Sequence, residues 1–304
     1  MHPVITLHHH IGQEGPFEQG LGIATPEAAF ERQIARLARD YDIIDLDMLL
    51  SGKWPRRPLL LTFDDTYRSV LDAGKRVLAR QGLPGVVFLN PGILGAGALS
   101  LDQTLAWATG KVGIGEVCKR LDLPVAESLG ALVVGAMSRF GAEARARIKE
   151  SLLQAFGPPD LTRRLPLLSA QEVAEFAGAG LEIGNHTMTH VHCRALSAEE
   201  RVQEISEAKK RLEALSGRPV RAFSVPYGHQ ADLTAPVLEA ARHSGHQAIF
   251  LVHARSNAHR PAPDIWYRTS LHDETPRQLR MKLVVLPTLR SLRQRLSGRV
   301  TGRV

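Results

Sequence analysis

Leu59-Leu60-Leu61-Thr62-Phe63-Asp64-Asp65 is the stretch that decides the fold of this chain, because an apolar strand ends there in two adjacent carboxylates. Successive side chains on a strand point to opposite faces, so Asp64 and Asp65 can serve one site only where the strand runs out into a loop. Thr66-Tyr67-Arg68 fits such a loop. An Asp pair after a strand is also typical of the N-cap and first turn of a helix, and the helical pattern from Val70 onward favours that interpretation.

A second motif, Gly184-Asn185-His186-Thr187-Met188-Thr189-His190, carries two histidines four residues apart. This separation places both imidazoles on one side of a helical turn, within reach of one metal ion, although an isolated pair is more often a polar helix face. The pair follows a predicted strand that begins at Leu181. Together, the two motifs offer two nitrogens and one oxygen at strand ends and leave positions on the ion for water and substrate. We therefore predict a metal-dependent hydrolase.

Strand and helix patterns alternate along the rest of the chain, which indicates a mostly parallel sheet. The predicted strands are Val4–Leu7, Leu59–Phe63, Gly85–Leu89, Leu181–Ile183, Arg221–Val225, Ala248–Val252 and Ile265–Leu271. The predicted helices are Glu27–Asp40, Ser69–Gln81, Ala170–Gly178, Ala198–Leu215 and Asp232–His243. Because the candidate chemistry lies at successive strand C-termini, we predict an α/β barrel with its site at that end.

Length and composition fit this prediction. A chain of 304 residues with 44% hydrophobic content can form one large barrel domain. Two cysteines, Cys118 and Cys193, form no disulfide framework and predict free thiols. From about Ser100 to Leu165 the pattern is helical, with the breaker Gly157-Pro158-Pro159 near its end. We predict a helical insertion that flanks the mouth of the site and either shapes substrate choice or covers apolar surface.

Three motifs resemble a known family in order and spacing. Thr62-Phe63-Asp64-Asp65, His186-Thr187-Met188-Thr189-His190 and Phe223-Ser224-Val225-Pro226-Tyr227-Gly228 are similar to the first three motifs of the polysaccharide deacetylases (NodB-homology domain, carbohydrate esterase family 4). The resemblance runs from about Val4 to about Leu279. It implies a distorted (β/α)7 barrel over residues 1–279, with the insertion at about 100–165, followed by a basic C-terminal helix or tail over residues 280–304.

The resemblance also implies roles for individual residues. Asp65, His186 and His190 would bind a divalent metal, most plausibly Zn²⁺. Asp64 would be the base that takes a proton from the water that this metal activates. The backbone N–H of Tyr227 would help to stabilise the oxyanion.

The substrate groove is implied in the same way. Pro226, Tyr227 and Gly228 would form one of its walls. His9, within His8-His9-His10, is similar to a histidine at the end of the first strand in such deacetylases and would line the pocket floor.

Two features depart from the family pattern. Many members carry an arginine, which orients the base, where this chain has Ser224. Arg268 in the last strand either takes over that task or is an ordinary cation at a strand edge. The family's general acid is a histidine on the last strand, and His272 lies in about the right place. His9 and His253 are rival candidates for the acid.

The C-terminal sequence is strongly basic. The net charge of the chain is +7, and no acid follows Glu274, whereas arginines alternate with leucines up to the end. Such a segment predicts either a basic amphipathic helix on an anionic membrane or a terminal helix that packs on the barrel with a solvated outer face. Nucleic-acid binding fits the charge, but the sequence shows no stacking platform or known binding motif.

The sequence also bears on location. The start at Met1 leads directly into a strand with no basic region or long apolar run, and no window holds 18 uninterrupted apolar residues. These features predict a cytoplasmic protein, either free or peripheral at the inner membrane surface.

The function that we expect is removal of N-acetyl groups from a glycan, either a polysaccharide or a lipid-linked sugar precursor. Two alternatives remain at this point. The same scaffold could hydrolyse a non-sugar amide or a formamide, because fold and metal do not fix the substrate. It could also be a catalytically silent glycan-binding protein, although a binder has no need for a base beside the metal.

Overall fold

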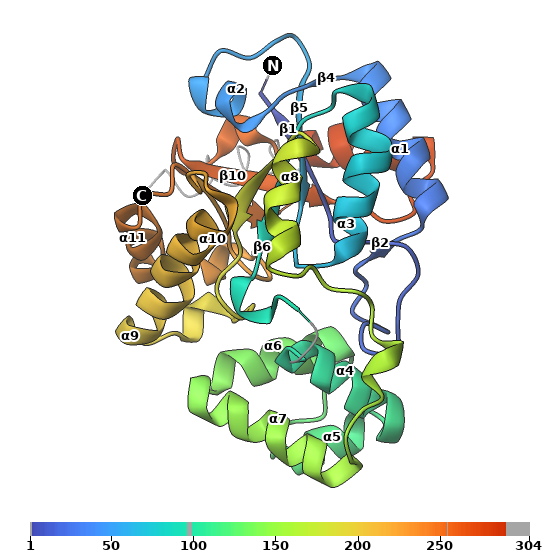
Figure 1. The fold of residues 1–304 in the computed structure, drawn as a ribbon, viewed down its shortest axis with the longest axis vertical. Coiled ribbons are helices and arrows are strands. Elements are labelled where there is room, and N and C mark those ends of the chain that lie inside the picture. The colour runs from blue at the N-terminus through green and yellow to red at the C-terminus, as the bar shows by residue number, and fades with distance from the viewer. Residues whose placement is uncertain (1, 96–98, 254, 290–304) are drawn as a thin grey trace, which may run out of the picture.

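Seven parallel strands close into a barrel in the computed structural model, which describes residues 2–95, 99–253 and 255–289 (Figure 1). Their order around the barrel is β1, β10, β9, β8, β7, β6 and β5, and β5 pairs back to β1. Their bounds are β1 (Val4–His8), β5 (Pro58–Phe63), β6 (Gly85–Leu89), β7 (Leu181–Asn185), β8 (Ala222–Ser224), β9 (Ala248–Val252) and β10 (Ile265–Ser270). The predicted (β/α)7 barrel is confirmed.

The pairing of β1 with β5 closes the barrel and fixes the level of the site. Val4 lies beside Leu59, and the register continues to His8 beside Phe63. The backbone N–H of Asp64 then donates to the carbonyl of His8 at 2.9 Å. The residues that follow these two strands, His9 and Asp64, therefore leave the barrel at the same end.

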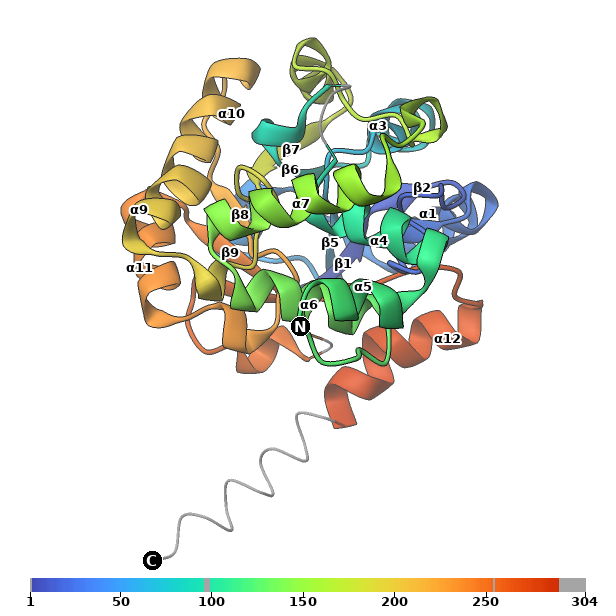
Figure 2. The same ribbon diagram turned by 90° about the horizontal axis from the view of Figure 1, so that it is seen from below.

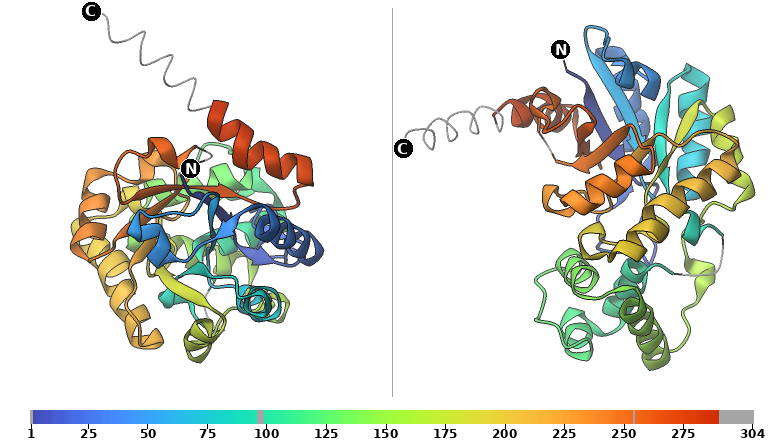
Figure 3. Two further views of the ribbon diagram at one scale, coloured as in Figure 1. Left: turned by 90° about the horizontal axis from the view of Figure 1, so that it is seen from above. Right: turned by 90° about the vertical axis from the view of Figure 1, so that its left-hand side faces the viewer.

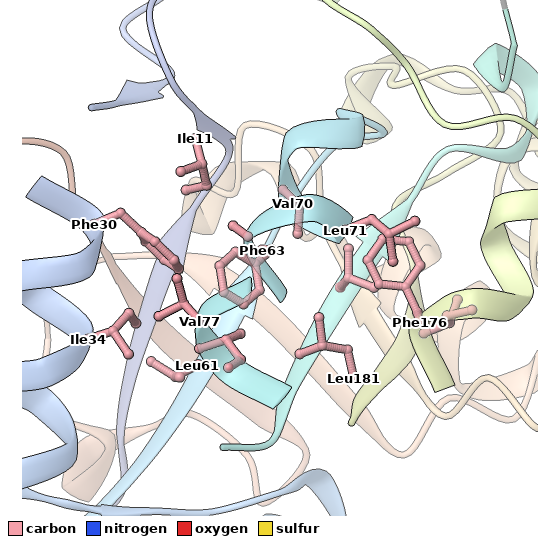
Figure 4. Close-up of a cluster of buried hydrophobic side chains, with 14 of the residues drawn as sticks. Ile11, Phe30, Ile34, Leu61, Phe63, Val70, Leu71, Val77, Phe176 and Leu181 are labelled. Carbon is pink, nitrogen blue, oxygen red and sulfur yellow. The ribbon is translucent and has the colours of Figure 1, made fainter. Parts of the chain in front are cut away.

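Helices surround the barrel and bury its outer face. They are α1 (Glu27–Asp40), α3 (Arg68–Ala73), α8 (Glu175–Gly178), α9 (Ala198–Arg201), α10 (Ala208–Ser216), α11 (Ala235–His243) and α12 (Pro276–Arg280). Figure 4 shows how Phe30 and Ile34 of α1 meet Phe63 and Leu61 of β5, with Phe176 of α8 at the other side of the cluster. Burial of these side chains holds the helices against the strands.

The predicted helices correspond to helical segments with local variations in winding. The helix predicted over Ser69–Gln81 begins at Arg68 and continues beyond Ala73 as a π-turn and a 3₁₀ turn to Gln81. Because α3 starts at Arg68, with Tyr67 at its N-cap, Asp64 and Asp65 do not cap a helix. That alternative interpretation of the Asp pair is wrong.

Four of the helices between β6 and β7 cover the end of the barrel at which the strands finish (Figures 2 and 3). They are α4 (Leu101–Val112), α5 (Ile114–Arg120), α6 (Leu129–Arg139) and α7 (Ala142–Phe156). They have a hydrophobic cluster of their own, which includes Leu105, Trp107, Leu132 and Leu152, and Tyr227 packs against it. Cys118 and Cys193 are buried free thiols, as predicted.

Four short elements within the first 51 residues have no counterpart in the sequence predictions. The strand β4 (Asp42–Ile43) pairs with β5 outside the closed barrel, and α2 (Leu46–Ser51) follows it. A separate two-stranded sheet joins β2 (His10–Ile11) to β3 (Ala24–Thr25). Strands of two residues are too short to show a hydrophobic period, so these strands could not be predicted.

Candidate active site

A cavity of about 360 Å³ opens at the C-terminal ends of the barrel strands. Its walls contain the predicted metal ligands and the predicted base, together with side chains from the helical insertion and from the loop before β3. The lining includes Asp64, Asp65, His186, His190, Asp102, Tyr227, His9 and His272. Parallel strands thus bring motifs that lie far apart in the chain to one pocket.

The Asp pair reaches the pocket because the backbone leaves the extended conformation immediately after β5. Asp65 has a left-handed backbone, with φ of 68°. Aspartate tolerates this conformation better than most residues, and such positions cluster at functional sites. The alternation of the strand is broken there, so that both Asp64 and Asp65 line the cavity. This agrees with the sequence argument that the two carboxylates can serve one site only in a loop.

Asp64 forms a buried bidentate ion pair with Arg268. Arg268 is fully buried, and its two terminal nitrogens donate to the two oxygens of Asp64 at 2.6 and 2.7 Å. Ser224 completes the group, because its hydroxyl donates to Asp64 at 3.1 Å and accepts from Arg268 at 2.7 Å. Arg268 is therefore not a strand-edge cation. It contacts the carboxylate that the sequence predicts to be the base.

This arrangement keeps Asp64 ionised. Burial favours the neutral acid, but the positive charge of Arg268 and its hydrogen bonds outweigh burial and hold the pKa of Asp64 well below its usual range. A carboxylate of this kind is charged throughout the neutral pH range. It can accept a hydrogen bond from a water molecule in the pocket, since a carboxylate has several acceptor positions.

The two histidines lie in a loop after β7 and not on a helical turn, so that part of the prediction is wrong. Thr187 and His190 have left-handed backbones, with φ of 68° and 58°. The side chain of Asn90 donates to the carbonyl of Thr187 at 3.2 Å, and that of Asn185 accepts from the N–H of Thr187 at 3.1 Å. The loop nevertheless places both imidazoles together, with their ring centroids 5.0 Å apart.

Ring nitrogens of both histidines face the Asp pair. Nδ1 of His186 donates to the carbonyl of Ser224 at 2.8 Å, which leaves Nε2 as the acceptor nitrogen, 3.7 Å from Oδ1 of Asp65. Nε2 of His190 lies 3.5 Å from the same oxygen. One ligand atom from each of Asp65, His186 and His190 lies within 4.8 Å of the others. The spacing and the donor set of two imidazoles and one carboxylate fit a divalent ion such as zinc.

Asp102, which the sequence analysis did not single out, holds the second histidine. Its Oδ2 lies 3.2 Å from Nδ1 of His190. Asp102 is in the first turn of α4, where Ser100 is the N-cap and Gln103 completes a capping box. A carboxylate on the outer nitrogen of a metal-binding histidine fixes its orientation and tautomer. The capping pattern Ser100-Leu101-Asp102-Gln103 was visible in the sequence, but nothing in it pointed to His190.

Electrostatics at this cluster favour a bound cation. Burial raises the pKa of Asp65 to about 7, and the charges of Asp64 and Asp102 add to this effect, against the charge of His190. For His190, the carboxylates Asp65 and Asp102 overcome burial and raise the pKa to about 9. Like charges that must share a small buried space are costly unless a positive charge is present. A divalent ion would supply that charge.

Two of the three candidates for the general acid line the pocket. His9 is half-buried, and burial of its ring lowers its pKa to about 3, so that it is neutral near pH 7. His272 is partly exposed, and its backbone N–H donates to Glu274 at 2.7 Å. His253 follows β9 and is not among the described residues that line the cavity. The choice of His272 as the acid stays a prediction.

Of the third motif, Tyr227 lines the cavity, whereas Pro226 and Gly228 are not among the described residues that line it, so their part in the wall stays a prediction. The ring of Tyr227 lies between His190 and His192, at centroid distances of 5.1 and 5.4 Å. Gly228 has φ of 67°, and a Cβ at this position would lie only 2.6 Å from the backbone nitrogen of Val252. Only glycine fits there, because any side chain would push the loop away from β9. Pro226 is buried immediately before these residues.

Comparisons with known proteins identify the family and support the fold. Residues 51–249 match the family model described as polysaccharide deacetylase. Among solved structures, the chain is similar to the Streptococcus pyogenes deacetylase PplD in complex with acetate, at 13% identity and a TM-score of 0.62, covering 93% of this chain and 98% of that one. It is also similar to a polysaccharide deacetylase from Bacillus cereus, at 16% identity and a TM-score of 0.60, covering 93% and 69%.

A third similar structure is IcaB from Ammonifex degensii, at 17% identity and a TM-score of 0.56, covering 91% of this chain and 93% of that one. At such identities the structural matches show the fold alone, and no curated protein matches the chain significantly. The family match, by contrast, extends over more than half of the chain. The chain therefore belongs to the polysaccharide deacetylase family and is a hydrolase that acts on carbon–nitrogen bonds other than peptide bonds.

Proposed function

We propose that this protein removes N-acetyl groups from a glycan and that Asp65, His186 and His190 hold a zinc ion for this reaction. When bound, such an ion lowers the pKa of a water molecule and polarises the acetyl carbonyl. The similar S. pyogenes deacetylase was solved with acetate, which is the product that the proposed reaction would release. Family membership supports a carbohydrate as the substrate.

The buried pair of Arg268 and Asp64 supports this proposal most strongly. Asp64 accepts the proton of the attacking water, and its ionised state and fixed orientation suit a general base. The two hydrogen bonds from Arg268 leave the carboxylate little freedom to rotate away from the cluster. A protein that only binds glycans gains nothing from a buried carboxylate that is held ionised in this way, so the silent-binder alternative is the weaker one.

The remaining steps use other groups of the pocket. The backbone N–H of Tyr227 donates to the oxygen that becomes negative during attack, since a fixed donor at that point stabilises the transition state. His272 donates a proton to the leaving amine. Beside these polar groups the cavity wall is apolar, since it includes Val252 and the insertion residue Val133. An apolar wall suits the methyl group of an acetyl substituent.

Acetate release from a panel of N-acetylated and O-acetylated glycans tests the proposal. Metal-stripped protein should be inactive, and added zinc should restore release from an N-acetylated substrate. Asp64→Asn should lower the rate by about 10²- to 10⁴-fold, the usual contribution of a general base, while zinc remains bound. Asp122→Asn, at an exposed aspartate in the insertion, is the matched control and should leave the rate unchanged.

Two results would count against the proposal. If no glycan releases acetate although zinc is tightly bound, the non-sugar amide or the silent binder becomes the better assignment. If Asp64→Asn keeps full activity, Asp64 is not the base.

A further inference from the structure

The C-terminal helical segment exposes apolar side chains on its outer face. This segment consists of α12 and the turns that continue it to Leu289. Met281, Val284 and Leu289 are 47%, 43% and 53% exposed, and they are three of the eight large hydrophobic residues that are exposed in the described part of the chain. Such a concentration on one short segment is unusual for a surface that only meets water.

The opposite face of the same segment is anchored to the barrel. Leu279 and Leu283 are buried in the cluster that also contains Leu37 of α1. Figures 2 and 3 show the segment on the outside of the barrel, with its C-terminal end at the surface. The buried leucines of the inner face are therefore enough to hold the helix against the barrel. The exposed apolar residues are not needed for this packing.

Positive charge surrounds the exposed apolar residues. Arg277 and Arg280 are exposed on the segment itself. The groove between α1 and α12 is lined by Arg57, Arg280 and Val284, among others, and the adjoining groove by Arg56, Arg255 and Val284. The acids nearby are already paired, Asp40 with Arg36 and Glu274 with Lys282. The sequence that follows, residues 290–304, lies outside the described residues and contains five arginines and no acid.

We propose that Met281, Val284 and Leu289 with Arg277 and Arg280, here called the docking face, bind the surface of a membrane that contains anionic lipid. Aliphatic side chains can insert among acyl chains while arginines contact negatively charged headgroups. Nucleic acid fits this face less well, because aliphatic side chains provide no stacking surface for bases. Within the described residues, no helix has the length and apolar content needed to cross a bilayer.

Polar contacts connect the docking face to the active-site pocket. Lys282, on the same segment, donates to the carbonyl of Ser270 at 3.3 Å and forms an ion pair with Glu274. Glu274 in turn accepts from the backbone N–H of His272, which lines the pocket. Docking would thus hold the pocket at a fixed orientation to the bilayer. If the proposed deacetylation is correct, a lipid-linked sugar becomes an accessible substrate.

Flotation of the full-length protein with vesicles tests the docking face. Vesicles of phosphatidylcholine with about one third phosphatidylglycerol should carry the protein at low salt, and those of phosphatidylcholine alone should not. Salt near 0.5 M should release it, because the electrostatic part of the contact is screened. Each arginine near such a surface strengthens binding by about fivefold, so Arg277→Gln with Arg280→Gln should weaken it by roughly 25-fold.

Matched variants separate the docking face from general surface properties. Met281→Ser with Val284→Ser should also weaken flotation, whereas Val125→Ser with Val202→Ser, at two other exposed valines, should not. The control for the loss of charge is Arg194→Gln with Arg211→Gln, at two other exposed arginines, and it should not weaken flotation either. Equal binding to neutral and anionic vesicles, or equal losses in the control variants, would overturn the proposal. So would binding to a DNA or RNA oligonucleotide in the absence of vesicle binding.

The vesicle experiment does not depend on the enzymatic proposal. Flotation is measured without substrate, and acetate release from a soluble glycan is measured without vesicles. The docking variants should retain acetate release from a soluble glycan, because none of the substituted side chains lines the catalytic cavity. The two proposals can therefore fail separately.

Discussion

Arg268 and Arg242 form ion pairs of the same kind in opposite surroundings. Each contacts both oxygens of an aspartate, Arg268 with Asp64 at 2.6 and 2.7 Å and Arg242 with Asp264 at 2.7 and 2.9 Å. The first pair is buried, whereas the side chain of Arg242 is 48% exposed. Water screens the second pair and replaces a lost partner, but it cannot do so inside the barrel.

Removal of the buried arginine should therefore be far more costly. We expect Arg268→Met to lower the free energy of unfolding by about 3–5 kcal/mol, because the charge of Asp64 is left buried without a partner. Arg242→Met should lower it by at most about 1 kcal/mol. Urea denaturation followed by circular dichroism measures both values. The double variant Arg268→Met with Asp64→Asn should recover part of the loss, and equal effects of the two single variants would contradict this explanation.

His8 should make stability depend on pH. Burial lowers the pKa of His8 to about 4, although a hydrogen bond with Gln33 opposes the shift, whereas an unfolded histidine titrates near pH 6.5. Between these values the unfolded chain takes up a proton that the folded chain does not. The contribution of His8 to the free energy of unfolding is therefore complete above about pH 6.5. It falls by roughly 3 kcal/mol as the pH decreases toward 4.

Chemical denaturation at pH 7 and pH 4.5 tests this prediction. His8→Gln retains a side chain that can hydrogen bond with Gln33 and should reduce the loss of stability on acidification. His243→Gln, at an exposed histidine of α11, should leave that loss unchanged. An identical pH dependence in wild type and His8→Gln would show that other groups account for it.

Helix α4 ties the insertion to the chemistry of the barrel. Its N-cap fixes the first turn, and Asp102 in that turn contacts the outer nitrogen of His190. The insertion also contributes Gly130, Val133 and Val134 of α6 to the pocket wall. It contacts the barrel side again through Arg145 of α7, which pairs with Glu200 of α9 at 3.4 Å. These contacts support a task in shaping the site beyond covering apolar surface.

Loss of Asp102 should weaken the proposed zinc site. We expect Asp102→Ala to lower zinc affinity by about 10- to 100-fold, as is usual for a carboxylate behind a ligating histidine, and Asp102→Asn to lower it less, because its oxygen can still accept from His190. Competition with a zinc-binding dye measures the affinity. Ser100→Ala removes the N-cap hydroxyl, which also donates to Asp102, at a cost of about 1 kcal/mol, but it leaves the contact of that carboxylate with His190. If it weakened zinc binding as much as Asp102→Ala, Asp102 would act only through the helix.

Closure of the barrel makes the proposed metal site a property of the entire fold. Asp65 follows β5, and His186 and His190 follow β7, so the three ligands come together only when β5, β6 and β7 are paired. An ion that binds the folded chain and not the unfolded one stabilises the folded state in proportion to the logarithm of its concentration.

Zinc should accordingly raise the temperature of unfolding. At a free zinc concentration 100-fold above Kd, the gain is about 2.7 kcal/mol, which corresponds to roughly 4 °C for a domain of this size. Thermal denaturation of metal-stripped protein, with and without zinc, measures the shift. His190→Ala should abolish most of it, and a shift that persisted in this variant would place the ion elsewhere.

Much of the fold could be predicted where the hydrophobic pattern is long. The strands Gly85–Leu89 and Ala248–Val252 and the helix Glu27–Asp40 coincide with the predicted ranges. The loop that holds the two histidines could not be predicted, because side chains from outside it, such as Asn90, set its conformation. The division of the chain at residue 279 and the roles of the site residues stay predictions, and residues 290–304 of the basic tail lie outside the described residues.

The sequence by itself determined the class of barrel, the family and the set of side chains at the strand ends, because these depend on local patterns and short motifs. The tertiary structure decided which distant groups complete the site. It showed that Arg268 reaches Asp64 across the barrel and that Asp102 of the insertion contacts His190. Contacts between elements so far apart in the chain depend on strand register and helix placement, and neither can be derived from spacing along the sequence.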